Sequence, residues 1–579
     1  MLYSLKVPSN ADNYTKADCF AHFLAKKEVT EVFLLSGGMI AFLSDSIFRL
    51  GKTRLINVRH EQSAGFAAEG VSRINGKPFV AMATSGPGAT NLITSIASSF
   101  FDSVPTIFIT GQVNQKELKK NRNQRQNGFQ ELDIIDMVKN VTKHSLRLNS
   151  THDVEFELNR LWDIALQGRP GPVLLDIPID VQQELAAIKS RTRKSFPSFQ
   201  VGYKVKSSHT KFERIKSELV QLINEADFPL ILLGGGVRSS CNIEIVRDLI
   251  EKLKIPCVYS LMGVDSLTSN SKYRVGMIGT YGNRWANQAL AKSDLIIALG
   301  SRLDIRQTGH DIKSFSKGKK IFRLDIDKAE LTGRIKADYS HQLDLNDFIN
   351  YVSKFEFDFN FYDWNEYILG LRQKSPPELE QSKDLKFNPV DIFKWINDVS
   401  ENTNGFIVDV GQHQMWAAQS LDINGKQRFI TSGGLGSMGF ALPAAIGASI
   451  TSKANWSVVS GDGCFQLSIS ELQTVKQYNL PLKIFILNNH QHGMVAQFQE
   501  DNLKGRFIAT RDDYSAPNFI EIASAYGITG KSISNYKEMY EYKSMIRDWT
   551  EGPIVIEINV PNSAKALPKL GVNNSILDL

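Results

Sequence analysis

The feature that most constrains the fold is an order of segments that occurs three times along the chain. A short apolar run ends in a Gly-rich turn, a helix-like segment follows, and a second apolar run comes next. This order is typical of parallel sheets whose strands are joined by crossover helices. In such sheets the turns after the strands lie at the edge where ligands bind. The sequence therefore predicts an α/β protein with three doubly wound parallel-sheet domains.

The predicted elements share this order in each third of the chain. The predicted strands are 79–84 and 105–110, then 229–233, 294–299 and 320–325, and finally 456–460 and 482–487. The predicted turns are 85–88, 234–236, Gly300 and 461–463, and the predicted helices are 89–101 and 468–478.

The length of 579 residues fits three or four domains at roughly 100–200 residues each. Two stretches that lack periodicity, the basic residues 186–206 and the Pro-containing residues 370–388, separate the repeated segments. We therefore predict a first domain over 1–190, a central domain over 191–365 and a last domain over 366–579.

The composition is that of a globular protein. Hydrophobic residues make up 42% and charged residues 22%, which excludes a disordered or collagen-like chain. A net charge of +6 over the whole chain is too dilute to indicate a nucleic-acid or membrane surface. The four cysteines lack C-x-x-C spacing, so we expect free thiols. Because no signal peptide or long apolar run is present, we expect a soluble cytoplasmic protein.

A metal site is indicated by polar residues that follow two predicted strands. Asp462 follows the strand 456–460 within Gly461-Asp462-Gly463, and Asn489 follows 482–487, 27 residues after Asp462. A carboxylate and an amide oxygen at neighbouring strand ends can share one Mg²⁺, which prefers oxygen ligands and bridges to phosphate. An ordinary tight turn is the alternative for Gly-Asp-Gly alone, and the Asn-Asn pair at this spacing argues against it.

These residues resemble the metal–diphosphate motif of the thiamine-diphosphate (ThDP) enzymes, which begins Gly-Asp-Gly and ends Asn-Asn. In that family a glutamate of another domain contacts the aminopyrimidine of the cofactor and promotes deprotonation of the thiazolium carbon. Glu61, in Arg59-His60-Glu61-Gln62, matches this glutamate and is the predicted catalytic residue. The resemblance implies domains that bind, in chain order, the pyrimidine end of ThDP, FAD, and the diphosphate with Mg²⁺.

Four further motifs, at 84–91, 168–173, 409–416 and 432–439, resemble one branch of the family, the acetolactate synthase (acetohydroxyacid synthase) large subunits. The likeness runs from about residue 32 to about residue 560. The resemblance implies that Met438 is the apolar wedge that bends ThDP. It implies that the metal ligands are Asp462, Asn489 and the carbonyl of Gln491. The residues implied to bind ThDP are Glu61, Pro87, Asn91, Gln412, His413, Gly436, Met438, Gly461, Gly463, Cys464 and Met494.

The central domain resembles the FAD-binding domain of the same branch. Because a carboligation is not a redox reaction, FAD would have a structural role. Gly-rich turns after strands suit a close approach to a nucleotide diphosphate, and packing within the protein is the alternative explanation for these glycines. The residues implied to bind FAD are Arg169, Gly235, Gly236, Gly279, Gly282, Asn287, Gly300, Arg302, Asp325 and Ile326.

The resemblance implies that pyruvate is decarboxylated and that its two-carbon unit is transferred to an acceptor carbonyl. With a second pyruvate the product is 2-acetolactate, which belongs to branched-chain amino-acid biosynthesis. Arg302 suits an acceptor carboxylate because a guanidinium group binds it with two parallel hydrogen bonds; a surface or domain-linking salt bridge is the alternative. A homodimer or homotetramer is also implied, with small-molecule partners. The residues at substrate-facing positions are Gly37, Phe129, Gln130, Arg302 and Phe498.

Three departures from the acetolactate synthase pattern lie where an acceptor would enter. Met39 ends Ser36-Gly37-Gly38-Met39, where the branch has Pro-Gly-Gly-Ala, and Phe498 replaces a tryptophan. The third departure is a longer loop, 115–128, whose charged residues are Lys116, Glu117, Lys119, Lys120, Arg122 and Arg125. One interpretation is an entrance for a larger anionic acceptor, such as a nucleotide-linked keto sugar. The other is a solvated charged loop.

Three other functions are alternatives to this one. An FAD-dependent pyruvate oxidase would consume oxygen, and the motif 412–416 argues against it. A nucleotide-dependent dehydrogenase needs Gly-x-Gly-x-x-Gly after a strand with an acidic residue about 20 positions on, and the sequence has no such set. A non-catalytic homologue would have no reason to keep Glu61, Asp462 and Asn489 together.

Overall fold

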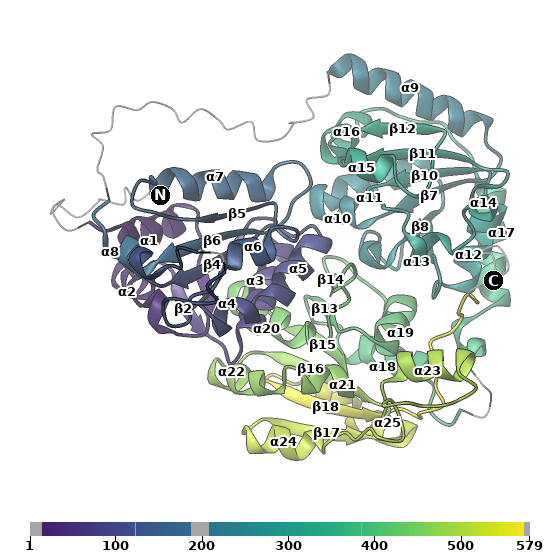
Figure 1. The fold of residues 1–579 in the computed structure, drawn as a ribbon. Helices are drawn as coiled ribbons and strands as arrows, with labels where there is room; N and C mark the ends of the chain where they lie inside the picture. The colour runs from purple at the N-terminus through teal and green to yellow at the C-terminus, as the bar shows by residue number, and fades with distance from the viewer. Residues whose placement is uncertain (1–13, 122, 187–207, 382, 384, 572–579) are drawn as a thin grey trace. The chain divides into compact units, whose positions relative to one another are not determined.

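The structure is a computed structural model that describes residues 14–121, 123–186, 208–381, 383 and 385–571. Its named strands form three six-stranded sheets, and every neighbouring pair within them is parallel (Figure 1). Helices connect successive strands, as parallel pairing requires. The predicted α/β class with three doubly wound parallel sheets is confirmed.

The first sheet has the strand order β2-β1-β3-β4-β6-β5, and the apolar strands β3, β4 and β6 are buried along their whole length. Its strands are β1 (Glu31–Leu34), β2 (Arg54–Asn57), β3 (Phe79–Ala83), β4 (Thr106–Gln112), β5 (His144–Arg147) and β6 (Val173–Pro178). Its helices are α1 (Lys16–Lys26), α2 (Ala41–Leu50), α3 (Glu61–Asn75), α4 (Pro87–Asn91), α5 (Ile93–Phe101), α6 (Ile134–Val138), α7 (Val154–Leu166) and α8 (Ile179–Gln183), with short 3-10 turns η2 (Gly38–Ile40) and η3 (Gln115–Glu117).

The second sheet has the order β12-β11-β10-β7-β8-β9, so its first strand, β7, lies in the middle. Its strands are β7 (Pro229–Leu233), β8 (Cys257–Tyr259), β9 (Arg274–Met277), β10 (Leu295–Leu299), β11 (Lys320–Asp325) and β12 (Tyr339–Gln342). Its helices are α9 (His209–Glu225), α10 (Gly235–Ser240), α11 (Ile243–Leu253), α12 (Arg284–Lys292), α13 (Ile305–Thr308), α14 (Ile312–Ser316), α15 (Lys328–Leu331), α16 (Leu345–Val352) and α17 (Tyr362–Lys374), with η4 (Leu261–Gly263).

The third sheet has the order β14-β13-β15-β16-β18-β17. Its strands are β13 (Gly405–Val408), β14 (Arg428–Thr431), β15 (Trp456–Gly461), β16 (Leu482–Asn488), β17 (Thr529–Ile533) and β18 (Ile554–Asn559). The helices in this part of the chain are α18 (Pro389–Val399), α19 (Gln412–Ser420), α20 (Ala441–Ser452), α21 (Asp462–Gln466), α22 (Leu472–Gln477), α23 (Gly493–Asn502), α24 (Phe519–Ala525) and α25 (Tyr536–Arg547), with η5 (Pro377–Glu380) and η6 (Ile469–Glu471).

The segments after the strands differ in detail from the prediction. The predicted turn 85–88 is shorter because Pro87 begins α4, where the fixed φ and missing N–H of proline suit the first helical turn. The predicted helix 89–101 is two helices, α4 and α5. Gly461 is still part of β15, and Asp462 is already the first residue of α21. The Gly-Asp-Gly segment is therefore a strand end joined to a helix start.

Of the two predicted domain boundaries, one falls within the described residues. The boundary at 190 lies outside the described residues and stays a prediction. The boundary at 365 falls inside α17, where the indole N–H of Trp364 donates to the carbonyl oxygen of Pro229 at 2.9 Å. This helix therefore packs with the second sheet, and the boundary is better placed after Lys374.

The chain forms two compact bodies. The first body holds the first sheet together with residues 432–454 and 468–480, and the second body holds the second and third sheets. Helices α20 and α22, which chain order assigns to the third domain, therefore belong to the first body. In the second body one buried apolar cluster includes Leu233 and Leu299 of the second sheet and Phe485 of the third.

Helices α3 and α20 of the first body lie against each other (Figure 1). A Cβ added at Gly70 would lie 2.4 Å from the carbonyl oxygen of Ala444, and one at Gly447 would lie 2.1 Å from that of Ala67. Each glycine thus faces the backbone of the other helix. Because a backbone cannot rotate away as a side chain can, the contact depends on both glycines.

We predict that Gly70→Ala or Gly447→Ala lowers the free energy of unfolding by about 2 kcal/mol, because the added methyl group forces the two helices apart. Gly370→Ala is the matched control, since it lies in α17 with nothing within 4 Å of an added Cβ. It should be neutral or stabilising by roughly 0.5–1 kcal/mol. Urea unfolding measures all three. Wild-type midpoints for both interface variants would contradict the packing argument.

Candidate active site

Glu61 lies beside the segment that follows β3 in the first body. It is the first residue of α3 and is 7% exposed. Its Oε2 accepts a hydrogen bond of 2.9 Å from the side-chain amide of Asn91, the last residue of α4. Gly88 leaves space next to this carboxylate, since a Cβ there would lie 3.4 Å from Oε1 of Glu61. The fold thus brings the predicted catalytic residue together with α4, whose first residue is the predicted cofactor residue Pro87.

Two of the predicted substrate residues lie beside the same segment. Gly37 packs on Thr84, where an added Cβ would come within 2.5 Å of the Thr84 Cβ. Gly86 has a φ of +60°, which favours glycine, and a Cβ there would lie 2.9 Å from the Cβ of Gln130. Phe129 is 78% exposed, so it contributes a large apolar side chain to the surface of this body.

The basic loop 115–128 is organised by a carboxylate bonded to its main chain. The side chain of Glu131 accepts hydrogen bonds from the backbone N–H groups of Lys119 at 2.8 Å, Asn127 at 2.7 Å and Gly128 at 3.4 Å. Burial acts to raise the pKa of Glu131, but these N–H groups outweigh it and lower the pKa. The carboxylate therefore stays ionised and ties both ends of the loop together.

The other acid of this loop is also bonded to the main chain. Oε2 of Glu117 accepts from the N–H of Asn114 at 3.2 Å. The predicted cation Arg122 lies outside the described residues. Within the described part of the chain, no carboxylate lies within ion-pair distance of four cations of this loop, which are Lys116, Lys119, Lys120 and Arg125.

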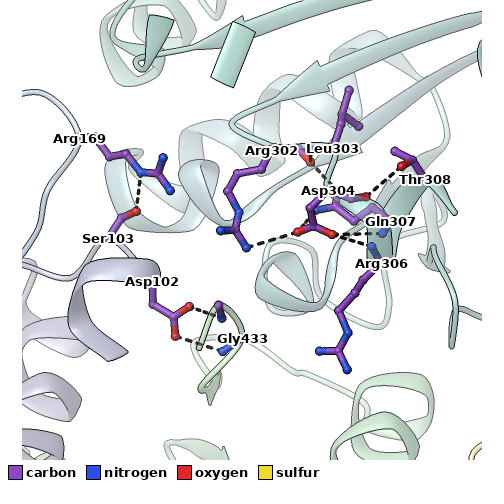
Figure 2. A network of polar contacts seen from close by, with 12 residues as sticks. Asp102, Ser103, Arg169, Arg302, Leu303, Asp304, Arg306, Gln307, Thr308 and Gly433 are labelled. Atoms are coloured by element: carbon purple, nitrogen blue, oxygen red, sulfur yellow. Dashed lines mark hydrogen bonds and ion pairs between the residues drawn. The ribbon is translucent and has the colours of Figure 1, made fainter. Parts of the chain in front are cut away.

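Gly436 and Met438 lie in the loop 432–439, which precedes α20 and belongs to the first body. The N–H of Ser437 donates to Oγ of Ser432 at 3.1 Å, which closes the loop on itself. Gly436 has a φ of +72°, a conformation that favours glycine. The start of the loop is bonded to the carboxylate of Asp102, which follows α5 (Figure 2).

In the second body, two predicted metal ligands follow adjacent strand ends. β15 and β16 are parallel neighbours with Gly461 opposite Leu487, so Asp462 and Asn489 lie at one edge of the sheet. Asp462 is 3% exposed, and its Oδ2 has no hydrogen-bond partner among the described residues. Burial raises the pKa of this carboxyl to about 6, although the hydroxyl of Tyr514 bonds to it. Such a buried oxygen costs free energy, and a bound cation would remove that cost.

Gln412 and Asn489 hold each other in place. The Nδ2 of Asn489 donates to Oε1 of Gln412 at 2.9 Å, and the Nε2 of Gln412 donates to Oε1 of Gln497 at 3.0 Å. Gly493 makes room for this chain of amides, because a Cβ there would lie 2.0 Å from Oε1 of Gln412. The orientation of the Asn489 amide is therefore set by its contact with Gln412.

His413 fills the space over two glycines at the same edge. Added Cβ atoms at Gly411 and Gly461 would lie 2.6 Å and 2.9 Å from its Cε1. Burial lowers the pKa of His413 to about 3, so the ring is neutral, and its Nε2 has no partner in the described part of the chain. Two buried polar atoms without partners, one each on His413 and Asp462, fit a diphosphate that carries a divalent cation.

The other predicted residues at this sheet edge contact neighbouring parts of the chain. The thiol of Cys464 donates to the carbonyl oxygen of Val410 at 2.9 Å. A Cβ at Gly463 would lie 2.8 Å from the ring of His492. The side chain of Gln491 donates to the carbonyl oxygen of Asn562 and accepts from Arg511, so a metal would use its main-chain carbonyl. Met494 and Phe498 lie one turn apart on α23, and Phe498 is 53% exposed.

Glycine turns meet at the carboxyl ends of β7 and β10 in the second sheet. The N–H of Gly236 donates to the carbonyl oxygen of Gly300 at 2.9 Å, and a Cβ at Gly234 would lie 2.1 Å from the same oxygen. At Gly235 an added Cβ would lie 2.9 Å from the side chain of Met262. These glycines are therefore needed for the two turns to touch, which is the packing explanation.

Three more of the predicted FAD residues form one cluster after β9. Asn287 bonds to both backbone groups of Gly279, accepting from its N–H at 2.9 Å and donating to its carbonyl oxygen at 3.0 Å. A Cβ at Gly282 would lie 2.5 Å from the carbonyl oxygen of Met277. Asn287 thus fixes the turn that Gly279 and Gly282 make possible.

The remaining predicted FAD residues lie at separate places. Asp325 ends β11, and its carboxylate accepts from the N–H of Asp327 at 2.9 Å; Ile326 follows it. Arg302 pairs with Asp304 at 3.3 Å (Figure 2), and about a third of each side chain is exposed, so the salt bridge it forms is a local one at the surface. Arg169, in the first body, donates from Nε to Oγ of Ser103 at 2.8 Å (Figure 2).

Two residues beside the site could not be found from the sequence. Tyr514, which bonds to Asp462, lies in a polar stretch without a motif. Asp102 lies 331 positions from Gly433, to which it is bonded. In the part of the chain that the structure describes, no helix is long and apolar enough to cross a membrane. No group of three or more His, Cys, Asp or Glu side chains there could hold a metal ion.

Family models for the domains of thiamine pyrophosphate enzymes match three parts of the chain. The N-terminal TPP-binding domain matches residues 14–137, the central domain 217–352 and the C-terminal TPP-binding domain 409–558. Over 564 residues the chain is 35% identical to the acetolactate synthase isozyme 2 large subunit of Escherichia coli, covering 96% of this chain and 98% of that protein. The chain belongs to the acetolactate synthase large-subunit family of ThDP enzymes.

Further relatives agree with this assignment. The chain is 34% identical to the acetolactate synthase large subunit of Lactococcus lactis over 545 residues, which is 93% of this chain and 91% of that protein. It is 34% identical to that of Porphyra purpurea over 574 residues, which is 95% and 93%. The protein is therefore a ThDP-dependent carboligase, and the family predicted from its motifs is confirmed.

We predict that Glu131→Gln loosens the basic loop, because an amide offers one acceptor oxygen to three N–H groups that now share a carboxylate. Trypsin should cleave after Lys119, Lys120 or Arg125 about tenfold faster, since losing hydrogen bonds to a charged group favours local opening. Asp133→Asn is the control, because Asp133 pairs with Arg147 and not with the loop backbone. Equal cleavage rates for wild type and Glu131→Gln would contradict this role.

Proposed function

We propose that this carboligase decarboxylates pyruvate and transfers the two-carbon unit to a second pyruvate, giving 2-acetolactate and CO₂. The observation that carries the proposal is the buried Oδ2 of Asp462, which has no hydrogen-bond partner among the described residues. Asp462 and Asn489 lie at the same edge of the third sheet. The reaction class is supported by relatives named acetolactate synthase that match along nearly the whole chain.

Mg²⁺ would be held by Asp462, the amide oxygen of Asn489 and the main-chain carbonyl of Gln491, because Mg²⁺ prefers oxygen ligands and keeps contact with phosphate. His413 would bind the diphosphate through its unpartnered Nε2. Bound ThDP would supply the electron sink on which a 2-keto acid loses CO₂. The chain's own groups therefore bind and orient, and few of them need to react.

Glu61 would hold a proton at the ring nitrogen of the aminopyrimidine. Three features suit it to this role: it is buried, Asn91 fixes its carboxylate from one side, and Gly88 leaves space on the other. A carboxylate placed in this way can give and take the same proton in each catalytic cycle. Gly436 and Met438 of the loop 432–439 would contact the cofactor, with Met438 as the wedge.

FAD is the second proposed cofactor, with a structural role. The proposal is supported by the order of the second sheet, which is the doubly wound order that binds dinucleotides where the direction of winding reverses. That place lies between β7 and β10, where Gly234, Gly236 and Gly300 meet. Because these glycines also have a packing explanation, added FAD is one of the conditions of the assay below.

A homodimer or homotetramer is proposed as the active form. Its support is the family resemblance, in which the pyrimidine end and the diphosphate end of ThDP are bound by different subunits. In this chain the two sets of residues belong to different bodies, with Glu61 in the first and Asp462 in the second. The proposal makes activity depend on protein concentration below the dissociation constant of the oligomer.

We predict that Glu61→Gln lowers pyruvate consumption at least about 100-fold, because the amide can bond to Asn91 but cannot exchange a proton. Glu28→Gln, which changes an exposed carboxylate of the same body, is the matched control and should equal wild type. The assay contains Mg²⁺ and ThDP, is run with and without FAD, and identifies products by mass spectrometry.

Two outcomes would contradict the proposal in different ways. Equal pyruvate consumption by wild type and Glu61→Gln would remove the catalytic role of Glu61. Consumption of oxygen together with pyruvate would identify an FAD-dependent pyruvate oxidase in place of a carboligase.

A nucleotide-linked keto sugar is the second candidate acceptor, and the basic loop 115–128 favours it. Glu117 and Glu131 are both bonded to the main chain, and four described cations against these two carboxylates leave the loop with a net positive charge. Phe129, directly after the loop, is 78% exposed. Unpaired cations beside an exposed aromatic ring suit a diphosphate joined to a planar base.

We predict for this candidate that Lys119→Glu/Lys120→Glu raises KM for a nucleotide-linked keto sugar about tenfold and more strongly at low salt, because the loop would attract its diphosphate. Acetolactate formation from pyruvate alone should not change. Lys52→Glu, an exposed lysine elsewhere on the same body, is the control. If pyruvate alone gives acetolactate at a biosynthetic rate and the double variant uses every acceptor as wild type does, the sugar candidate is wrong.

A further inference from the structure

The loop 432–439 is bonded at its start to one buried carboxylate. Oδ1 of Asp102 accepts from the N–H of Gly434 at 2.6 Å, and Oδ2 accepts from the N–H of Gly433 at 3.1 Å (Figure 2). The two oxygens thus bind two successive amides of the main chain. All three residues belong to the first body, so this contact does not depend on how other parts of the chain are placed.

Asp102 is itself held by a buried arginine. NH2 of Arg73 lies 2.5 Å from Oδ2 of Asp102 and 2.5 Å from Oε1 of Glu69. The exposed fractions of these side chains are 9% for Arg73, 2% for Asp102 and 0% for Glu69. Ion pairs shielded from water in this way are costly to break, because a remaining partner stays buried without compensation.

The end of the loop is fixed by the same arginine. Phe440, which follows the loop, packs edge-on against Phe66 with ring centroids 5.4 Å apart. The guanidinium carbon of Arg73 lies 5.5 Å from the centroid of the Phe440 ring. Arg73 therefore contacts both Asp102, which holds the start of the loop, and the residue directly after its end.

Glycine is required where the carboxylate meets the loop. A Cβ at Gly434 would lie 2.8 Å from Oδ1 of Asp102 and 2.8 Å from the Cβ of Phe101. A side chain at this position would push the main chain away from the carboxylate. The close approach and the two hydrogen bonds therefore depend on each other. Changing either Asp102 or Gly434 should disrupt both.

We propose that Asp102, supported by Arg73, is a positioning residue that sets the loop 432–439 for the cofactor. The inference rests on the proposed contacts of Gly436 and Met438 with ThDP, since these residues come directly after the amides that Asp102 binds. Asp102 touches neither substrate nor cofactor in this account. It acts by holding the main chain, so that the binding energy of ThDP is not spent on ordering the loop.

The experiment compares Asp102→Asn, Gly434→Ala and their double variant with wild type. Asp176→Asn is the matched control, because Asp176 is also a fully buried carboxylate bonded to an arginine, Arg147 at 2.7 Å, and it does not contact the loop. Calorimetric titration with ThDP in the presence of Mg²⁺ gives Kd. Hydrogen exchange of the protein without ThDP gives the protection of the amides of residues 433 and 434.

We expect Kd for ThDP to rise about tenfold in Asp102→Asn and in Gly434→Ala, and to rise little further in the double variant, because both changes break the same contact. The amides at 433 and 434 should exchange about tenfold faster. Asp176→Asn should lower the melting temperature without changing either quantity. Should Asp102→Asn fail to fold, Gly434→Ala keeps the test intact.

Wild-type Kd and wild-type exchange in Asp102→Asn and Gly434→Ala would overturn the proposal. An equal loss of ThDP affinity in Asp176→Asn would also overturn it, since the effect would then be general destabilisation. Failure of the proposed function has a different signature: wild type would form no acetolactate from pyruvate, while Kd for ThDP and the exchange at residues 433 and 434 would still respond to Asp102→Asn.

Discussion

The parallel register of β15 and β16 is the constraint on which the candidate active site depends. It places the first residue after β15 and the residues after β16 at the same edge of one sheet. Asp462 and Asn489 become neighbours there, although they are far apart along the chain. The amides of Gln412 and Gln497 and the ring of His413 then pack around this edge, and each limits the space left for a ligand.

Two buried carboxylates of this chain, Glu131 and Asp462, differ in how fully their oxygens are hydrogen-bonded. Glu131 accepts three backbone N–H groups, and its pKa is lowered although burial acts in the other direction. Asp462 is buried with one oxygen that has no partner among the described residues, and its pKa is raised to about 6. The difference lies in the supply of positive partners. Asp462 is the one whose surroundings leave an oxygen free for a further partner.

The sequence allowed the sheets and the strand-end motifs to be predicted, because these depend on local apolar runs and on residues next to them. It did not indicate that α20 and α22 belong to the same body as the first sheet, or that Asp102 binds Gly433. Such contacts join residues hundreds of positions apart, and neither partner stands out by type or spacing. The role of Glu131 could not be predicted for another reason. Its partners are backbone N–H groups, which nearly every residue of any sequence has.

The first and third sheets have the same strand order when each is counted from its own first strand. By this count α3 and α20 are equivalent, since each follows the second strand of its sheet, and they pack together through Gly70 and Gly447. Asp102, after the third strand of the first sheet, binds the amides before α20. Glu471, after the third strand of the other, accepts from the N–H of Arg59 at 2.9 Å, just before α3. Each of the two sheets is thus followed, after its third strand, by a carboxylate that binds main-chain amides next to the other sheet's equivalent helix. Asp102 holds the segment that leads to Gly436, and Glu471 holds the segment that leads to Glu61.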